Sequence, residues 1–218
     1  MSTTDEKKKK RALALLLFLP LASLRKEIAI GADRLEREFT SIFDEYEETA
    51  SVAKAVQSGV SGLATVFTDL IASALSRGYR DAVNFTGAFD PKFKAGIDKL
   101  AQAEGSKVAK QMMKTTKGWM KANGSDGYTL SRDRAEAAIR YKAAEAYFNA
   151  VGAVFRTSDD DWEKEWNTTS DDPCDECLDN EDQGFISMLD EFQSGHFAPL
   201  AHLHCACFLR VRRAGTGD

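Results

Sequence analysis

All four cysteines of this chain follow residue 173, and they stand in two close pairs. Cys174 and Cys177 are separated by two residues, whereas Cys205 and Cys207 are separated by one. Two of the three histidines stand just before the second pair. Thiolate and imidazole are the donors that tetrahedral zinc sites use, and a two-residue spacing lets both sulfurs face one ion. The pattern therefore predicts a structural zinc site.

The sequence offers more donors than the four that one zinc ion needs. The candidate ligands are Cys174, Cys177, His202, Cys205 and Cys207. The first two cysteines and Cys205 belong to each preferred set, and either His202 or Cys207 completes it. His204 adjoins Cys205 and could bind the same ion only with strain, while His196 is expected at the surface or beside the ligands. A site filled by protein ligands has no open position for a reacting water, so we expect no enzymatic activity.

Three other interpretations of the cysteine pairs compete with zinc. Disulfides would suit a secreted protein. A redox CxxC would be expected beside a βαβ pattern, which the sequence lacks. A metal-dependent hydrolase would need an open coordination position and a general base, for which Asp175 and Glu176 are the nearby candidates. The spare ligands favour a closed structural site over these alternatives.

The elements that would position this site are mainly helical. Apolar residues recur at helical spacing through residues 24–156, which predicts an antiparallel bundle of four long helices. The expected helices span 24–56, 63–83, 91–121 and 131–155, with Gly59 and Gly62 punctuating the first two. Asp90 followed by Pro91 is a good helix start, and Ser131 is the expected N-cap of the fourth helix.

Residues 157–218 change in character and are expected to form a separate module. The predicted fold class is mainly α: a long-helix bundle followed by a small zinc-stabilised α+β module with a short hairpin. Trp162 and Trp166 are four residues apart, the spacing of one helical turn, and could pin this segment to the bundle. The apolar stretch from Phe208 to Val211 is expected to supply a short strand.

Composition and charge narrow the class of protein. The 218 residues carry a net charge of -5, with 43% hydrophobic and 29% charged residues, which is ordinary for a soluble globular protein. This net charge argues against a dedicated nucleic-acid binder. The charge is unevenly spread, because residues 7–11 are all basic, whereas residues 159–182 hold twelve acids against one lysine. A polarised chain of this kind often docks its ends onto different partners.

Residues 1–23 form a basic and apolar N-terminal arm. Its apolar stretch, residues 12–22, is shorter than the roughly 20 residues that span a bilayer. A signal peptide and a membrane-surface anchor are alternative interpretations, but the positions before a cleavage site hold Pro20 and Ala22, where two small residues are wanted. The favoured interpretation is a hydrophobic arm that is buried against a partner chain.

The order of motifs in the last 50 or so residues resembles that of a known family. Trp166 is followed by the CxxC pair, then by Gly184 and Pro199, then by the sequence HLHCAC and a short apolar strand. This order is similar to the C-terminal signature of the phage Mu F-like minor head proteins, also called head morphogenesis proteins. The upstream region is similar only in being helical.

The resemblance implies a structural protein of a tailed-phage virion with a structural zinc ion. Such a protein would associate with portal or capsid subunits, could form a homo-oligomer on the virion, and would assist head assembly or DNA packaging and delivery. It could contact packaged DNA without sequence specificity and would need no small-molecule substrate. The expected location is the virion head or neck, and the host cytoplasm during assembly. The alternative is a zinc-containing adaptor that binds a protein partner, or nucleic acid through Arg210, Arg212 and Arg213.

Overall fold

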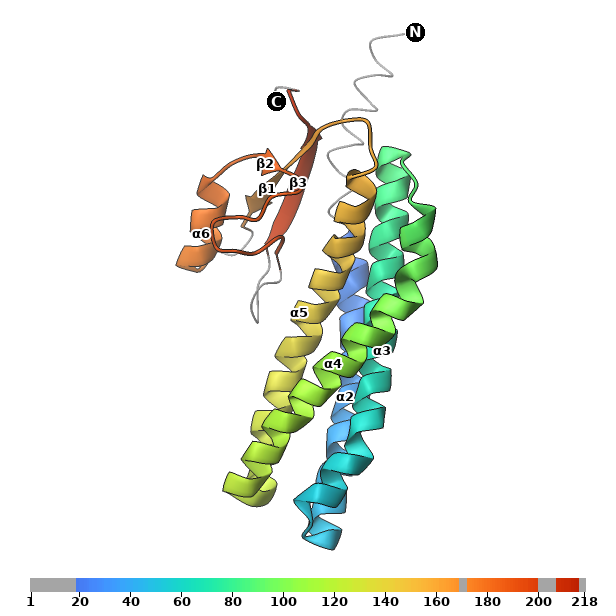
Figure 1. Cartoon of the computed structure of the whole chain (residues 1–218). Helices are drawn as coiled ribbons and strands as arrows, with labels where there is room; N and C mark the ends of the chain where they lie inside the picture. Colours follow the sequence, from blue (N-terminus) through green and yellow to red (C-terminus); the bar gives the residue numbers. More distant parts are fainter. Residues whose placement is uncertain (1–18, 169–171, 200–206, 216–218) are drawn as a thin grey trace.

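Four long helices form the body of the protein. The computed structural model describes residues 19–168, 172–199 and 207–215. The helices are α2 (Leu19–Thr49), α3 (Val52–Thr86), α4 (Pro91–Asn123) and α5 (Gly127–Phe155), and a small sheet packs beside α5 at one end of them (Figure 1). The predicted mainly helical fold is confirmed. Residues 1–18 of the arm expected over 1–23 lie outside the described residues, and its last five residues belong to α2, which begins earlier than predicted.

The α3–α4 connection follows the sequence signals closely. The Phe93 amide donates to Asp90 Oδ1 at 2.9 Å, and Pro91 occupies the first helical position, so the predicted helix start is confirmed. Gly87 ends α3 with a left-handed φ of 74°, and its amide donates to the Val83 carbonyl. Glycine is favoured at such a left-handed helix end because it has no Cβ to clash with the backbone.

The first helix break lies at a different place from the one that the sequence predicts. The expected helix over 24–56 is divided at Ala50, which has a φ of 50°, and Ser51 then caps α3 by accepting a hydrogen bond from the Lys54 amide. Gly59 and Gly62 lie inside α3, not between helices. Gly59 permits close packing, because a Cβ there would collide with the buried Ile42 side chain of α2, whereas a Cβ on Gly62 would meet only the carboxylate end of Glu38, which can rotate away.

The start of the fourth helix also differs from the prediction. The expected loop is a short 3₁₀ turn, η1 (Gly124–Asp126), and α5 begins directly after it at Gly127. Ser131 is therefore not an N-cap. It is fully buried on α5, and its hydroxyl has no hydrogen-bond partner in the described structure. A serine in a helical sequence resembles a start signal even where the helix simply continues through it.

Helix α3 is the centre of the bundle, since it packs against α2, α4 and α5. It buries Leu63, Phe67, Leu70 and Ile71 among many others. By length and composition α3 could also cross a membrane, a test that a buried core helix meets equally well. Small residues bring its neighbours close: a Cβ on Gly105 of α4 would lie 2.6 Å from the Thr68 amide nitrogen of α3.

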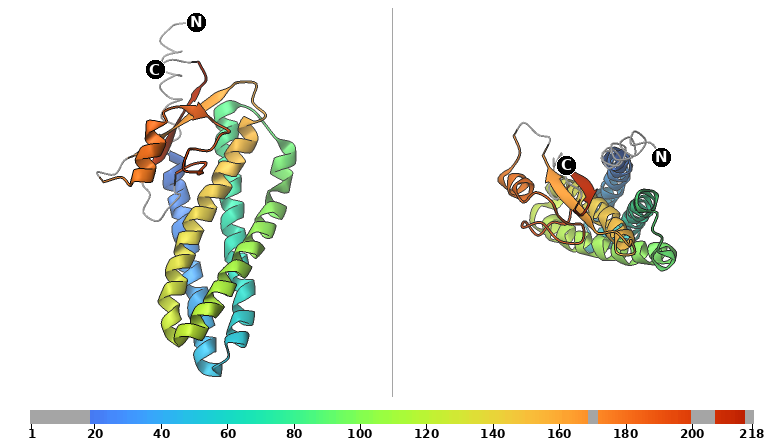
Figure 2. Two further views of the ribbon diagram at one scale, coloured as in Figure 1. Left: turned by 60° about the vertical axis from the view of Figure 1, so that its left-hand side comes forward. Right: turned by 90° about the horizontal axis from the view of Figure 1, so that it is seen from above.

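The C-terminal module is a three-stranded antiparallel sheet with one short helix. The order is β2 (Ile186–Ser187), β1 (Trp162–Asn167), β3 (Phe208–Arg213), and α6 (Asp175–Asp182) lies between β1 and β2 in the chain. The register runs from Trp162 opposite Arg213 to Asn167 opposite Phe208. Both panels of Figure 2 show this module beside the end of the bundle.

Two expectations about this module need correction, and one is confirmed. The sheet has β1 at its centre and is not a short hairpin. Trp162 and Trp166 lie on a strand, not on a helix, and they share a face because a spacing of four is also even. The strand expected at Phe208–Val211 is confirmed as part of β3.

The close approach of α3 and α4 predicts that Gly105→Ala destabilises the protein by about 1–3 kcal/mol, because the obstructing atoms include the amide nitrogen and Cα of Thr68, which cannot rotate away. Gly118→Ala on the same helix is the matched control, since an added methyl group there would meet nothing within 4 Å. We expect the control to be stabilised by about 0.5–1 kcal/mol through helix propensity. Urea denaturation followed by circular dichroism measures both, and equal stabilisation of the two variants would contradict the packing argument.

Candidate metal centre

The first cysteine pair is organised by the start of α6. Cys174 occupies the position before the helix, and its carbonyl accepts hydrogen bonds from the amides of Cys177 and Leu178 at 3.0 and 3.1 Å. The pair is thereby bent around the first helical turn. The Cys177 side chain is buried at the base of this turn, whereas Cys174 is exposed.

Cys207 lies immediately before the start of β3, which pairs with the end of β1. It is buried and directly precedes Phe208, which pairs with Asn167 at the end of β1. The next residue, Thr168, donates from both its amide and its hydroxyl to the Glu181 carboxylate on α6, each at 2.9 Å. Glu181 lies one helical turn beyond Cys177. The end of β1 thus connects the start of β3 to the helix that carries the CxxC pair.

The remaining candidate ligands lie outside the described residues. These are His202 and Cys205, together with the lower-ranked His204. Within residues 19–168, 172–199 and 207–215 there is no group of three His, Cys, Asp or Glu side chains that could hold a metal ion. Cys177 and Cys207 are both buried. The zinc site therefore stays a prediction, for which three of the five proposed ligands have described positions.

His196 lies beside the cysteine pair, which is one of its two expected placements. Its Nε2 atom is 2.9 Å from a carboxylate oxygen of Glu176, which stands between the two cysteines in the sequence. The contact connects the loop that follows β2 to α6. The contact holds the first turn of α6 against this loop.

The tryptophans fix the module internally and to the bundle. Trp162 contacts Phe85 of α3 and Phe155 of α5, with ring centroids 4.9 and 5.2 Å apart. The expected attachment to the bundle is therefore present at Trp162. Trp166 is fully buried and contacts Phe192 edge-on, so it packs within the module.

Lys164 is an interior residue that the sequence analysis did not single out. It lies between the two tryptophans on the inward face of β1, and its side chain is fully buried. Its Nζ atom donates to the Phe197 carbonyl at 2.8 Å and lies 3.3 Å from the centre of the Phe197 ring. One side chain thus holds the loop of residues 190–199 against the sheet. The alternating pattern of β1 was a usable signal, because it places residue 164 on the same face as both tryptophans.

Burial has a marked effect on the charge state of this amine. It lowers the pKa of Lys164 from 10.5 to about 7, while the nearby carboxylates of Asp190 and Glu191 act in the opposite direction. A charged amine loses its hydration in an apolar interior, and these two acids only partly compensate for that loss. Near pH 7 the folded protein therefore holds a mixture of charged and neutral Lys164.

The outward face of β1 is paired with arginines of β3. Arg210 contacts Glu165 at 2.9 Å and Arg212 contacts Glu163 at 2.8 Å, both across the strand pair. Arg213, at the end of β3, contacts Asp160 at 2.8 Å. The three arginines that would anchor nucleic acid in the adaptor alternative are engaged in ion pairs that hold the sheet together.

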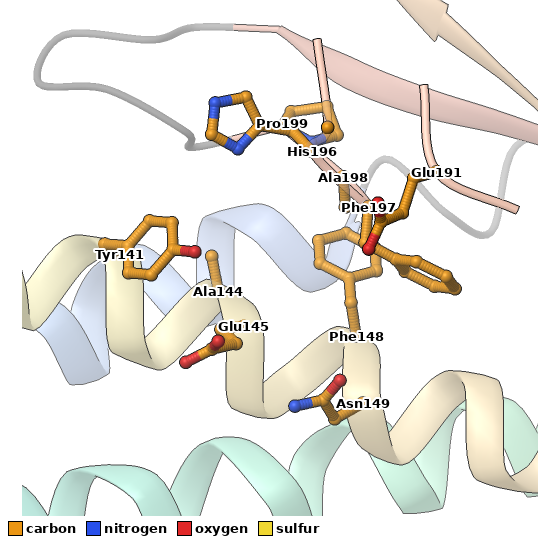
Figure 3. Close-up of a pocket in the computed structure, with 11 residues that line it drawn as sticks. Tyr141, Ala144, Glu145, Phe148, Asn149, Glu191, His196, Phe197, Ala198 and Pro199 are labelled. Atoms are coloured by element: carbon orange, nitrogen blue, oxygen red, sulfur yellow. The ribbon is translucent and has the colours of Figure 1, made fainter. Parts of the chain in front are cut away.

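A small pocket of about 170 Å³ lies where the module meets the bundle. Figure 3 shows Tyr141 and Phe148 of α5 on one side and His196 and Phe197 of the loop on the other. Its acidic wall residue on α5, Glu145, is paired with Lys142 at 2.6 Å. His196 and Glu145 each have a partner, Glu176 and Lys142 respectively, and the pocket lies between two packed parts of the molecule.

No protein-family model, curated protein or solved structure matches this chain.

The lowered pKa of Lys164 predicts how the stability of the protein depends on pH. Above about pH 7 the folded protein releases the Lys164 proton while the unfolded chain keeps it up to about pH 10.5, so the free energy of unfolding should rise with pH across this window by up to about 1.4 kcal/mol per pH unit. Lys164→Met should remove this contribution. The measurement is urea denaturation of both proteins at several pH values from 7 to 9.5, followed by tryptophan fluorescence. The difference between the two slopes isolates Lys164 from other titrating groups, and parallel slopes would contradict the assignment.

Proposed function

We propose that this chain is a non-enzymatic structural protein of a phage virion, similar to the Mu F-like minor head proteins, whose C-terminal module is closed by a structural zinc ion. The observation that carries the proposal is that the CxxC pair stands at the start of α6, and that Glu181 of this helix accepts two hydrogen bonds from Thr168, just after the end of β1 that pairs with the start of β3. The resemblance in motif order supplies the phage-head context.

The chemistry of the module supports a structural role for the metal. Its core is small and is built around Trp166, Phe192 and Met188, and it surrounds a lysine whose charged form is costly to bury. Zinc would supply a cross-link between segments, and its binding free energy would add to the folding free energy of the module. Cys174 and Cys177 would hold it from the start of α6, Cys205 would be the third ligand, and either His202 or Cys207 would complete the set.

The proposed partners are portal or capsid subunits, with packaged DNA as a further contact. The four-helix body offers long exposed faces, and the N-terminal arm offers a basic and apolar segment for a partner chain. The protein would act in the virion head or neck and would be present in the host cytoplasm during assembly. Self-association on the virion is compatible with this role.

The adaptor alternative is less well supported. Its nucleic-acid contacts were assigned to Arg210, Arg212 and Arg213, and all three are paired with acids of the module. An exposed ion pair of this type can be broken, but a surface whose cations are already neutralised attracts phosphate weakly. The protein-binding form of the adaptor remains an alternative to the virion role.

The metal is tested on the purified full chain by elemental analysis. We expect about one zinc per chain, and the double substitution Cys174→Ser and Cys177→Ser should abolish zinc retention, since two thiolate ligands are lost together. The same variant should become sensitive to proteases beyond about residue 170 while its helicity stays nearly unchanged. The control is Asp175→Ser with Leu178→Ser, two exposed positions on the same helix.

Full zinc retention by the double cysteine variant, or a wild-type chain that binds no zinc after refolding with it, would reject the metal site. Protease resistance unchanged from the wild type would reject its structural role. The control separates metal loss from mere damage to α6, because it alters the helix and leaves all four cysteines.

The virion role has its own measurement. Mass spectrometry of purified virions from cells that produce this chain should find it among the head or neck proteins at low copy number. Its absence from virions, together with retained zinc, would leave the metal site intact and would favour the adaptor.

A further inference from the structure

Helix α4 carries most of its charge on one face. It has eight lysines and only two acids, Asp98 and Glu104, in a protein whose net charge is -5. We define the α4 lysine stripe as the following seven residues, all of them exposed: Lys92, Lys99, Lys107, Lys110, Lys114, Lys117 and Lys121. Their spacing makes them a single surface, because the last five follow one another at intervals of three and four.

The stripe is narrow and long. At 100° per residue the seven positions fall within about 80° of the helix circumference, and at 1.5 Å per residue they extend over about 44 Å. The opposite face of α4 is buried against the bundle through Ala101, Val108 and Met112. The stripe is therefore held rigidly along one outer edge of the molecule, where α4 runs the length of the bundle (Figure 1).

Its positive charge is largely uncompensated. Among the described residues, the stripe has one ion pair, between Lys107 and Glu104 at 3.6 Å, and both side chains of that pair are well exposed. Asp98 and Glu104 fall outside the arc that the stripe occupies. Seven like charges on one face repel one another, so the fold maintains this surface at a cost in stability.

We infer that the α4 lysine stripe binds the phosphate backbone of double-stranded DNA without sequence specificity. The inference deepens the proposed function, since it gives the contact with packaged DNA a defined surface, but it stands on α4 alone and uses none of the candidate metal ligands. Duplex DNA carries one negative charge for about every 1.7 Å of its axis, so a row of ammonium groups of this length can face several phosphates along the duplex.

The composition of the stripe selects this partner over the alternatives. Lysine is a point charge that suits phosphate contacts, and the stripe contains no Arg, Asn or Gln for bidentate contacts to base edges. Protein interfaces are depleted in lysine and built on aromatic anchors, which the stripe lacks. A membrane-bound helix would have to insert an apolar face, and the apolar face of α4 is already buried in the bundle.

The test is fluorescence anisotropy of a labelled 30-base-pair duplex of mixed sequence, titrated with the full-length protein at several salt concentrations. We expect the triple substitution Lys110→Gln, Lys114→Gln and Lys117→Gln to weaken binding at least tenfold at ~50 mM salt. The slope of log affinity against log salt should become shallower by about 2–3, since each phosphate contact contributes about 0.9. A duplex of unrelated sequence should give the same affinities.

Two control variants carry the same change in net charge. The first control is a triple variant that alters exposed lysines outside the stripe: Lys26→Gln, Lys54→Gln and Lys94→Gln. Lys7→Gln with Lys8→Gln and Lys9→Gln alters the N-terminal basic block. Binding that both controls retain and the stripe variant loses supports the proposal, provided that circular dichroism shows equal helicity.

Three results would overturn it. The first is no binding of the wild-type chain to the duplex at low salt. The second is an equal loss of affinity in the stripe variant and in either control. The third is salt-sensitive self-association that the stripe substitutions abolish while duplex binding is unchanged, which would assign the stripe to a second copy of this chain. Because the readout is DNA binding, a failure here leaves the zinc and virion tests unaffected.

Discussion

The strand β1 organises the C-terminal module through its two faces. Trp162, Lys164 and Trp166 point inward, and Glu163 and Glu165 point outward to arginines of β3. The inward face fixes the module to the bundle, holds the loop before the candidate ligands, and fills the small core. Both α6 and the start of β3 contact the end of β1, so this strand fixes their positions relative to each other.

How far the sequence could predict the structure depended on the kind of signal. Asp90 and Pro91 predicted the start of α4 correctly, because a helix cap and the fixed φ of proline depend only on neighbouring residues. Ala50 was missed because a non-glycine residue with a positive φ carries no compositional mark, and Ser131 was misread because burial within the bundle overrides its capping preference. The spacing of Trp162 and Trp166 fits both a helical turn and one face of a strand, so only pairing with β3 decides between them.

The candidate site was predictable in its residue types but not in its surroundings. The cysteine spacing identifies candidate metal donors, because tetrahedral zinc sites use only a few ligand types at characteristic spacings. Lys164 and the α4 lysine stripe were overlooked for different reasons. A lysine in an acid-rich segment is typical of the surface until its neighbours are known, whereas the stripe is visible in the sequence as a three-four spacing that the overall negative charge conceals.

The pairing of Trp162 with Arg213 has a consequence for how the chain folds. The backbone hydrogen bonds of each helix join residues four positions apart, although α3 and α5 also pack on each other across the intervening α4. The β1–β3 ladder instead pairs residues about 40 to 50 positions apart, and the chain must close that loop before any of its hydrogen bonds can form. Contacts of this long-range kind slow folding. Each helix can therefore form before the sheet, and the module can pack on Phe85 and Phe155 only after α3 and α5 have come together, because Trp162 contacts both rings.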